Sequence, residues 1–286
     1  MSKIKKNKTI ILAAISVCLI ILIIWILWAN TALEINTHVI NSDNLPESFS
    51  GFRIAQVSDL HNANFGEENE ILLEKLKETN PDIIVITGDL VDSRNTDIEV
   101  GIEFAKKAVE IAPTYYVTGN HESRISEYGT LKEGLLDAGV VVLENERVEL
   151  ERAGEKIVLL GVDDPSFQTS YLFGDSASVT DSALQELTDE ENAYTILLAH
   201  RPELFKTYVE NDVDLVFCGH AHGGQFRLPF VGGLVAPNQG FFPKYDAGFY
   251  MEDNTTMVVS RGIGNSILPL RINNRPEIVV IELSKR

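Results

Sequence analysis

The sequence predicts an α/β fold, with one large domain behind an N-terminal transmembrane helix. Strand-like apolar segments alternate with helical segments over residues 51–286. Five of the apolar segments end in a carboxylate, amide or imidazole side chain, and an uncharged apolar run lies near the N-terminus. A chain of 286 residues is long enough for one large or two small domains. Because no internal repeat or long linker divides the chain, we expect one domain.

The apolar run covers residues 9–29 (TIILAAISVCLIILIIWILWA), which contain no charged side chain. About 20 such residues cross the ~30 Å hydrocarbon core of a bilayer as a helix, so the run predicts a transmembrane anchor. The alternative is a cleaved secretory signal. Such a signal usually has an apolar region of only about 7–15 residues and a small-x-small cleavage site. The following WANTAL is a poor site of this kind, so we expect an uncleaved anchor.

The charges that flank this run predict its orientation. Four lysines precede it, namely Lys3, Lys5, Lys6 and Lys8, and the first charge after it is Glu34. Basic segments stay on the cytoplasmic side of a membrane. We therefore expect a cytoplasmic basic tail at residues 1–8, a membrane-exit segment at 30–50 and an extracytoplasmic domain at 51–286. The protein would be a single-pass protein of the cell membrane.

The elements of the domain are expected from their residue patterns. Helical spacing of apolar residues predicts helices at 67–80, 97–111 and 124–138. Apolar runs predict strands at 52–59, 82–89, 114–121, 139–145, 156–162, 194–200, 214–220 and 277–283. Residues 250–260 have the pattern of a hairpin, and LEINTHVI (33–40) is a candidate first strand.

Five of these strands end in a polar side chain, and these are Asp59, Asp89, Asn120, His200 and His220. In open α/β sheets the ligand site forms at the carboxyl ends of the strands. If the strands share one sheet, these side chains converge on one of its edges. Residues far apart in the sequence would then build one site.

Five of the six histidines lie at or just after these strand ends, and only His38 stands apart. The polar set comprises Asp59-x-His61, Gly88-Asp89, Gly119-Asn120-His121-Glu122, His200 and Gly219-His220-Ala221-His222. Carboxylate, imidazole and amide ligands suit a divalent cation such as Mn²⁺, Zn²⁺ or Fe²⁺. The set is too large for one ion, and Asp89 in its middle is the natural carboxylate to bridge two. Each motif alone could be a turn, a helix cap or a structural histidine, so the prediction depends on their joint occurrence.

The formal net charge of −18 limits the partners of the chain. A protein this acidic is a poor general binder of nucleic-acid backbones, so no nucleic acid polymer is expected as a partner. A phosphate ligand would need a local positive charge. Bound metal ions would supply that charge.

The order of the motifs resembles the calcineurin-like metallophosphoesterase superfamily over nearly all of the chain after the anchor. Within it, the stretches SDLHNANFG and GHAHGGQFRLPF are similar to the membrane-associated branch of YaeI- and YkuE-type phosphodiesterases. The resemblance implies a four-layer α/β/β/α sandwich that binds two divalent metal ions per chain. One ion would take Asp59, His61, Asp89 and His222. The second ion would take Asp89, Asn120, His200 and His220.

The resemblance also implies an activity. The protein would be a membrane-anchored phosphodiesterase in which a metal-bridging hydroxide attacks the phosphorus atom. His121 would not be a ligand but the general acid that protonates the leaving oxygen. The substrate is a phosphoester, with a lipid-linked one as a candidate. Alternatives are a phosphomonoesterase, a pyrophosphatase on a lipid-linked substrate, and a metal-dependent binder of anionic wall polymer or phospholipid without turnover.

For two further groups of residues the sequence allows two roles each. The loop 225–245 contains five aromatic residues, which are Phe226, Phe230, Phe241, Phe242 and Tyr245. They form either an apolar rim that contacts lipid or a cluster packed beneath an ordered loop. Near the C-terminus, Arg261, Arg271 and Arg275 are either phosphate contacts or ion-pair partners.

Overall fold

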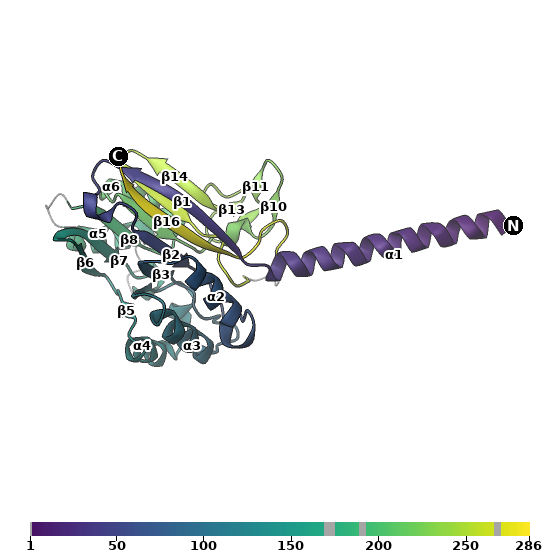
Figure 1. Cartoon of the computed structure of the whole chain (residues 1–286), viewed down its shortest axis with the longest axis horizontal. Helices are drawn as coiled ribbons and strands as arrows, with labels where there is room; N and C mark the ends of the chain where they lie inside the picture. Colours follow the sequence, from purple (N-terminus) through teal and green to yellow (C-terminus); the bar gives the residue numbers. More distant parts are fainter. Residues whose placement is uncertain (1, 169–174, 189–192, 266–269) are drawn as a thin grey trace.

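Helix α1 (Ser2–Thr31) projects away from the rest of the chain (Figure 1). The structure is a computed structural model that describes residues 2–168, 175–188, 193–265 and 270–286. The stretch Ile10–Thr31 has a mean hydropathy of 3.3, and its most apolar part is not buried against the protein. It is long and apolar enough to cross a bilayer, in agreement with the expected anchor at residues 9–29.

The first sheet has six strands in the order β1-β16-β2-β3-β4-β5. Their bounds are β1 Glu34–Ser42, β2 Arg53–Val57, β3 Ile83–Thr87, β4 Thr114–Val117, β5 Val141–Val142 and β16 Glu277–Lys285. Strands β2 to β5 are parallel, and β16 is antiparallel to β2. Strand β1, in the segment expected to leave the membrane, pairs along its whole length with β16.

The second sheet also has six strands, in the order β14-β15-β9-β8-β7-β6. Their bounds are β6 Glu146–Arg152, β7 Glu155–Gly161, β8 Thr195–Leu198, β9 Leu215–Cys218, β14 Gly248–Glu252 and β15 Thr255–Val259. Strands β7, β8, β9 and β15 are parallel, and the two edge strands are antiparallel to their neighbours. Strand β6 was not expected, because its sequence ERVELER is mostly charged and only its pairing with β7 makes it a strand.

Helices cover the outer face of each sheet. Helices α2 (Glu70–Glu78), α3 (Ile98–Val109) and α4 (Tyr128–Asp137) pack on the first sheet through Leu72, Leu76, Phe104, Leu131 and Leu135. Helices α5 (Ser176–Leu187) and α6 (Phe205–Glu210), which were not expected, pack on the second sheet through Leu184, Phe205 and Tyr208. Between the sheets lies a third core that includes Ile54, Val85, Leu159, Leu198 and Phe217. The expected four-layer α/β/β/α sandwich is therefore confirmed.

The five strands with polar ends do not share one sheet. Strands β2, β3 and β4 belong to the first sheet, whereas β8 and β9 belong to the second. The condition that all five strands share one sheet is therefore not met, because an apolar strand pattern does not reveal which strands pair. Gln56 joins the two sheets across the core, since its Nε2 donates to Thr87 Oγ1 at 2.9 Å and to the Cys218 carbonyl at 2.9 Å. The two sets of strand ends therefore meet at one edge of the sandwich.

Short elements complete the fold. Loop 225–245 contains two small hairpins, formed by β10 (Arg227–Leu228) with β11 (Gly232–Gly233) and by β12 (Val235–Ala236) with β13 (Gly240–Phe241). Single 3-10 turns lie at Glu47–Phe49, Glu67–Asn69, Glu122–Arg124, Pro165–Phe167, Pro202–Leu204 and His222–Gly224.

Candidate dinuclear metal centre

All seven expected metal ligands lie together where the two sheets meet. Asp59, Asp89 and Asn120 follow β2, β3 and β4, whereas His200 and His220 follow β8 and β9. His61 and His222 come two residues after the first ligand of their own motifs. All seven side chains are buried (Asp59, His61, Asp89, Asn120, His200, His220 and His222). A buried cluster of carboxylates and imidazoles without a cation would be costly, so this burial favours a metal site.

The backbone at the site is held in an uncommon conformation. Five of these residues have a positive φ angle between 46° and 65°: Asp59, His61, Asp89, His220 and His222. A non-glycine residue in the left-handed region costs of order 1–3 kcal/mol and persists where the surrounding structure imposes it. Such strain clusters at functional sites, and here it turns each side chain back toward the sheet edge.

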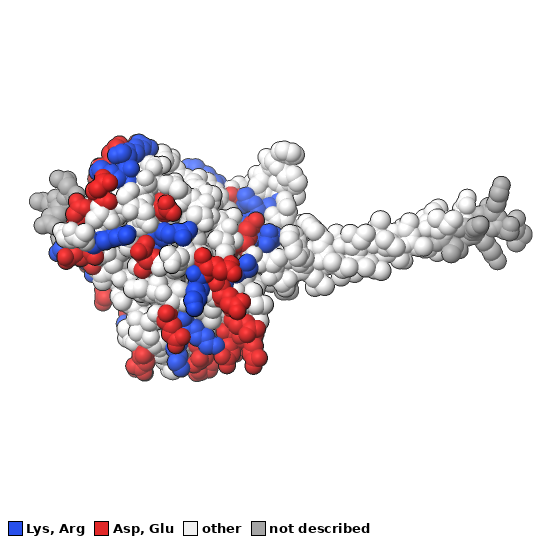
Figure 2. Space-filling model, in the orientation of Figure 1, with Lys and Arg blue, Asp and Glu red and all other residues white. Residues whose placement is uncertain are grey.

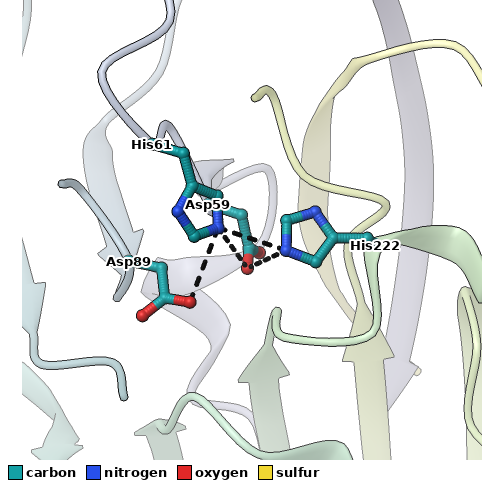
Figure 3. Close-up of side chains that lie close together, drawn as sticks. All are labelled: Asp59, His61, Asp89 and His222. Atoms are coloured by element: carbon teal, nitrogen blue, oxygen red, sulfur yellow. Dashed lines mark hydrogen bonds and ion pairs between the residues drawn. The ribbon is translucent and has the colours of Figure 1, made fainter. Parts of the chain in front are cut away.

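The first group of ligands consists of Asp59, His61, Asp89 and His222 (Figure 3). His61 Nε2 lies 3.2 Å from His222 Nε2, 3.5 Å from Asp89 Oδ2 and 3.8 Å from Asp59 Oδ1. His222 Nε2 lies 3.3 Å from Asp59 Oδ1. Two imidazole nitrogens and two carboxylate oxygens thus converge on one point, as the ligands of a four-coordinate divalent ion do.

The second group consists of Asp89, His200 and His220. His200 Nε2 lies 3.2 Å from Asp89 Oδ2 and 3.1 Å from His220 Nδ1. The same oxygen of Asp89 is therefore close to His61 on one side and to His200 on the other. This is the position of a carboxylate that bridges two ions.

Asn120 lies beside Asp89, because the following residue, His121, donates its backbone N–H to Asp89 Oδ1 at 2.8 Å. Among the described residues, the buried Oδ1 of Asn120 has no hydrogen-bond partner. A buried amide oxygen without a partner is uncommon in a native protein and calls for a ligand. The donor set therefore fits a second cation that Asn120 would help to hold.

Surrounding groups orient the ligands. The Thr87 carbonyl lies 2.8 Å from His200 Nδ1 and so requires a proton there, which leaves the Nε2 lone pair of neutral His200 directed toward Asp89. The Asp59 carboxylate accepts from the backbone N–H of His220 at 3.1 Å and from Ser58 Oγ at 2.6 Å. These bonds fix the ligand atoms before any ion binds.

The electrostatics of the site without metal also suit a cation. Burial raises the pKa of Asp59 to about 6 and lowers the pKa of His61 to about 4. Burial opposes ionisation of Asp89 and His200 as well, but their mutual attraction outweighs it. The pKa of Asp89 therefore falls well below its usual value, and that of His200 rises to about 10. A proton on His200 thus balances the Asp89 charge, and a bound cation would replace that proton.

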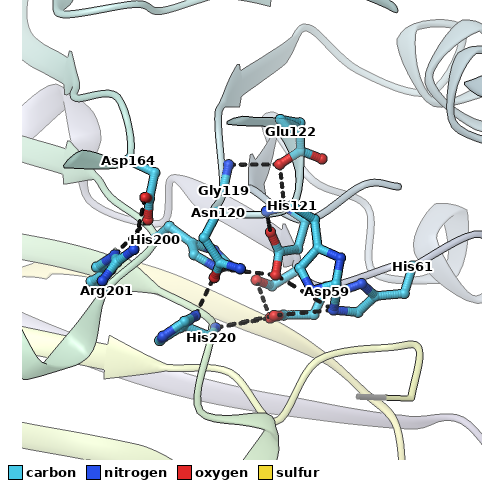
Figure 4. A network of polar contacts seen from close by, with 12 residues as sticks. Asp59, His61, Gly119, Asn120, His121, Glu122, Asp164, His200, Arg201 and His220 are labelled. Carbon is cyan, nitrogen blue, oxygen red and sulfur yellow. Dashed lines mark hydrogen bonds and ion pairs between the residues drawn. The ribbon is translucent and has the colours of Figure 1, made fainter. Parts of the chain in front are cut away.

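His121 lies at the edge of this cluster, with its ring centroid 4.5 Å from that of His61 (Figure 4). Its Nδ1 accepts a hydrogen bond from the backbone N–H of Ser93 at 3.0 Å. Neutral His121 must therefore carry its proton on Nε2. The ring is less buried than the seven candidate ligands. Ser93 contacts Nδ1, whereas the proton is on Nε2. His121 also forms, with His61 and Asp92, a group of side chains that could hold a metal ion.

Comparison with known proteins identifies the family. A model of the calcineurin-like phosphoesterase family matches residues 52–224, which is more than half of the chain and contains all seven ligands and His121. The chain belongs to the calcineurin-like phosphoesterases. The family is dinuclear-metal dependent, and this phosphoesterase has the buried Asp/His cluster that such a centre needs.

Individual relatives support the assignment. The uncharacterized metallophosphoesterase YkuE of Bacillus subtilis is 32% identical over 258 residues, covering 88% of this chain and 85% of YkuE. The phosphodiesterase YaeI of Escherichia coli is 30% identical over 240 residues, covering 81% and 82%. A transmembrane protein with metallophosphoesterase domain from Danio rerio is 32% identical over 85% of this chain but only 55% of its own length. The name of the Danio rerio relative and the apolar helix α1 together indicate membrane association of this phosphoesterase.

A solved structure agrees with the fold. The crystal structure of TT1561 from Thermus thermophilus superposes with a TM-score of 0.51 at 16% identity. The match covers 75% of this phosphoesterase and 91% of TT1561. At this identity the match supports the sandwich architecture alone.

Glu122 is a site residue whose role the sequence did not reveal. Its fully buried carboxylate accepts four backbone N–H bonds: from Asp89 at 3.0 Å, Leu90 at 2.7 Å, Val91 at 3.2 Å and Gly119 at 2.7 Å. Figure 4 shows the bond from Gly119. These bonds tie the turn after β3 to the turn after β4. Glu122 ends the Gly-Asn-His-Glu motif, but three of its four partners, Asp89, Leu90 and Val91, lie 31 to 33 residues away in the sequence.

Glycine is required where the ligand turns approach one another. A Cβ on Gly119 would lie 2.3 Å from Asp89 Oδ1, and one on Gly219 would lie 2.4 Å from Asp59 Oδ2. Side chains of other residues do not fit at such distances. The glycines of the motifs thus make room for the two carboxylates.

The three C-terminal arginines are structural in this phosphoesterase. Arg261 pairs with Glu34 at 2.7 Å and with Glu277 at 2.6 Å, and Arg275 pairs with Glu34 at 3.4 Å. Arg271 is buried and donates to the carbonyls of Arg261 and Gly264. Of the two interpretations left open by the sequence, ion pairing therefore holds for Arg261 and Arg275. Buried Arg271 bonds carbonyls instead.

Proposed function

We propose that the protein is a membrane-anchored phosphodiesterase that uses two divalent metal ions. The observation that carries this proposal is the position of Asp89 Oδ2, 3.5 Å from His61 Nε2 and 3.2 Å from His200 Nε2. One carboxylate oxygen between two ligand groups is what two ions about 3.5–4 Å apart require. The family supports a metal-dependent phosphoester hydrolase, and its relative YaeI, which is called a phosphodiesterase, favours a diester as substrate.

The chain's own groups have distinct roles in this proposal. Asp59, His61, Asp89 and His222 would hold one ion, and Asp89, Asn120, His200 and His220 would hold the other. When bound, such ions supply a nucleophilic water of lowered pKa and positive charge that offsets the phosphoryl oxygens. Manganese, zinc and iron all suit this ligand set.

His121 would act as the general acid. Ser93 contacts its Nδ1, so the Nε2 proton of the charged imidazolium would be the one available to a leaving oxygen, and the ring would become neutral on donating it. Proton donation by a positioned histidine contributes typically 10²–10⁴-fold to a rate. In the charged ring Nδ1 also carries a proton, which would replace the hydrogen bond from the Ser93 N–H, and Asp92 Oδ1, 3.5 Å from Nδ1, would stabilise that charge.

The decisive experiment measures hydrolysis by the full-length chain in detergent after chelation and return of Mn²⁺ or Zn²⁺. An aryl phosphodiester and the matching monoester serve as substrates, and the variants are His121→Gln and Asp89→Asn. We expect metal-restored diester cleavage, reduced about 10²–10⁴-fold in His121→Gln with its metal retained. Asp89→Asn is expected to lose metal and activity together. His38→Gln, at an exposed position outside the site, is the matched control.

Other outcomes point to the alternatives. Faster cleavage of the monoester would identify a phosphomonoesterase. Two bound metal ions without turnover of either ester would contradict the phosphodiesterase proposal. The next panel would then hold lipid-linked pyrophosphates, anionic wall polymer and phospholipid.

We also propose that α1 crosses the cell membrane with residues 1–8 in the cytoplasm and the catalytic domain outside. The lysines before the span support this orientation. Exposed Ala153 lies in the β6–β7 hairpin turn, so a cysteine placed there reports the side on which the domain lies. Labelling of Ala153→Cys by a membrane-impermeant thiol reagent on intact cells is expected. Labelling only after cell lysis would reverse the proposed topology.

A further inference from the structure

An exposed apolar surface lies on the two small hairpins that follow the metal motif. Phe230 lies in the turn between β10 and β11 and is fully exposed, and Phe241 and Phe242 at the end of β13 are 74% and 62% exposed. The backbone N–H of Phe242 donates to the Leu234 carbonyl at 2.9 Å, which holds the end of β13 beside the end of β11. We call this surface the phenylalanine patch, and it comprises Leu228, Phe230, Val231, Phe241 and Phe242.

The aromatic residues of loop 225–245 do not all follow one of the two interpretations, an apolar rim or a cluster packed beneath the loop. Tyr245 is buried and stacks edge-on against Phe205 and Tyr250, so it packs beneath the loop. Phe230, Phe241 and Phe242 do not pack in this way. Large exposed apolar side chains on two neighbouring hairpins indicate an interaction surface.

The patch lies on the side of the domain from which α1 leaves. Hairpin β10–β11 projects beyond the sheets on the side where the C-terminal end of α1 meets the domain (Figure 1), and the tip of that projection carries no charged residue (Figure 2). Lys244 is exposed close behind the patch in the sequence. An apolar tip with a nearby cation is typical of segments that enter the interface of a bilayer.

Polar contacts fix the direction of α1 relative to the domain. Asn30 exchanges two hydrogen bonds with the backbone of Arg271, at 2.7 and 3.0 Å. The Arg275 guanidinium donates to the Ala32 carbonyl at 2.9 Å and lies 4.6 Å from the centre of the Trp28 ring. The last turn of the helix is thus bound to the domain, without a flexible linker between them.

The tryptophans place the membrane surface. Trp25 and Trp28 lie in the last two turns of α1 and are both exposed, and tryptophan is enriched at membrane–water interfaces. The interface is therefore at the end of α1 that contacts the domain. Because the β10–β11 projection lies beside this end, it is at the level of the same interface.

We propose that the phenylalanine patch inserts into the bilayer that α1 crosses and forms a second membrane contact of the domain. This inference rests on the membrane-spanning part of the proposed function but not on the activity. The patch and the metal centre are connected, because Asn238 in the β12–β13 turn lies 3.4 Å from His220 Nε2 and 2.8 Å from Glu203 Oε1. Insertion would hold the metal centre at a set position close to the membrane surface.

The test places a fluorophore on the patch in the full-length chain, reconstituted with one chain in each lipid nanodisc. Phe230→Cys and Phe241→Cys are made in a Cys18→Ala background, since the other cysteine, Cys218, is buried. Leu136→Cys on α4 is the matched control, because Leu136 is also apolar and 49% exposed but lies on a different part of the domain. Lipids with quencher groups on their acyl chains then report contact with the bilayer.

We expect quenching at positions 230 and 241 and unchanged emission at position 136. Emission at 230 and 241 as bright as at 136 would overturn the inference, provided that a label on native Cys18 is quenched and so reports an inserted helix. Bright emission at Cys18 as well would overturn both the anchor and the docking, but would leave the phosphodiesterase proposal intact. If the fluorophores at positions 230 and 241 were shielded from solvent only in discs that hold two chains, the patch would be a contact between copies. That result would also overturn the inference of bilayer insertion.

Discussion

The substitution Glu122→Gln tests whether this buried carboxylate holds the metal-binding turns in place. Glutamine has the same shape but replaces one acceptor oxygen by an NH₂ donor. Two of the four backbone N–H groups that Glu122 binds, at 2.7 to 3.2 Å, would then face a donor. Losing two hydrogen bonds to a charged group costs about 3–6 kcal/mol, at about 1.5–3 kcal/mol each.

The charge of Glu122 moderates this estimate. Burial and the nearby charge of Asp89 raise the pKa of Glu122 to about 7, so a neutral side chain relieves an unfavourable charge. The lower end of the range, about 3 kcal/mol, is therefore expected. At about 2–4 °C per kcal/mol for a domain of this size, the thermal midpoint should fall by about 6–12 °C.

The assay combines thermal unfolding of the full-length chain with its metal content after dialysis. Glu122→Gln is expected to unfold earlier and to bind less metal, because the turns that carry Asp89 and Asn120 are no longer held together. Glu127→Gln, an exposed neighbour, is the control and should change stability by less than about 0.5 kcal/mol. Full metal content in Glu122→Gln, with a midpoint within about 2 °C of wild type, would refute the positioning role.

Three further predictions concern the same region. Gly119→Ala should abolish metal binding, because its Cβ would lie 2.3 Å from Asp89 Oδ1 and must displace it; unchanged metal content by elemental analysis would contradict this. Asp164→Asn should destabilise the protein by about 3–5 kcal/mol at pH 7, since it breaks the buried pair with Arg201. Burial opposes ionisation of Asp164, but the attraction of Arg201 is stronger, so the pKa of Asp164 is lowered. The extra free energy of unfolding of the wild type over Asp164→Asn should therefore be complete above about pH 4, and it should disappear as the pH falls through the lowered pKa. Acid unfolding of both chains measures this, and a constant difference down to pH 2 would be inconsistent with it. An ion present at 100 times its Kd stabilises the folded state by about 2.7 kcal/mol, so removal of metal by a chelator should lower the thermal midpoint. An unchanged midpoint would argue against metal binding.

The sequence alone was enough to determine which residues come together at the site. Five of the seven candidate ligands lie just after an apolar segment, and His61 and His222 follow two residues later. A strand buried on both faces has to be apolar, so the pattern is local. The end of such a strand is a place where a polar side chain can leave the core, and Asp59, Asp89 and His220 mark three of these ends. The sequence also predicted one helix long and apolar enough to cross a bilayer, because bilayer thickness sets the length of such a run.

Only the tertiary structure decided how these segments are arranged. An apolar pattern does not specify which strands pair, so the division of the ligands between two sheets could not be predicted from the sequence. The four partners of Glu122 are backbone groups, which have no signature in the sequence at all. Whether an aromatic residue is buried depends on what packs above it. Tyr245 and Phe230 come from the same loop, yet one lies under a hairpin and the other at a hairpin tip beside α1, because the turn geometry carries only Phe230 out of the fold.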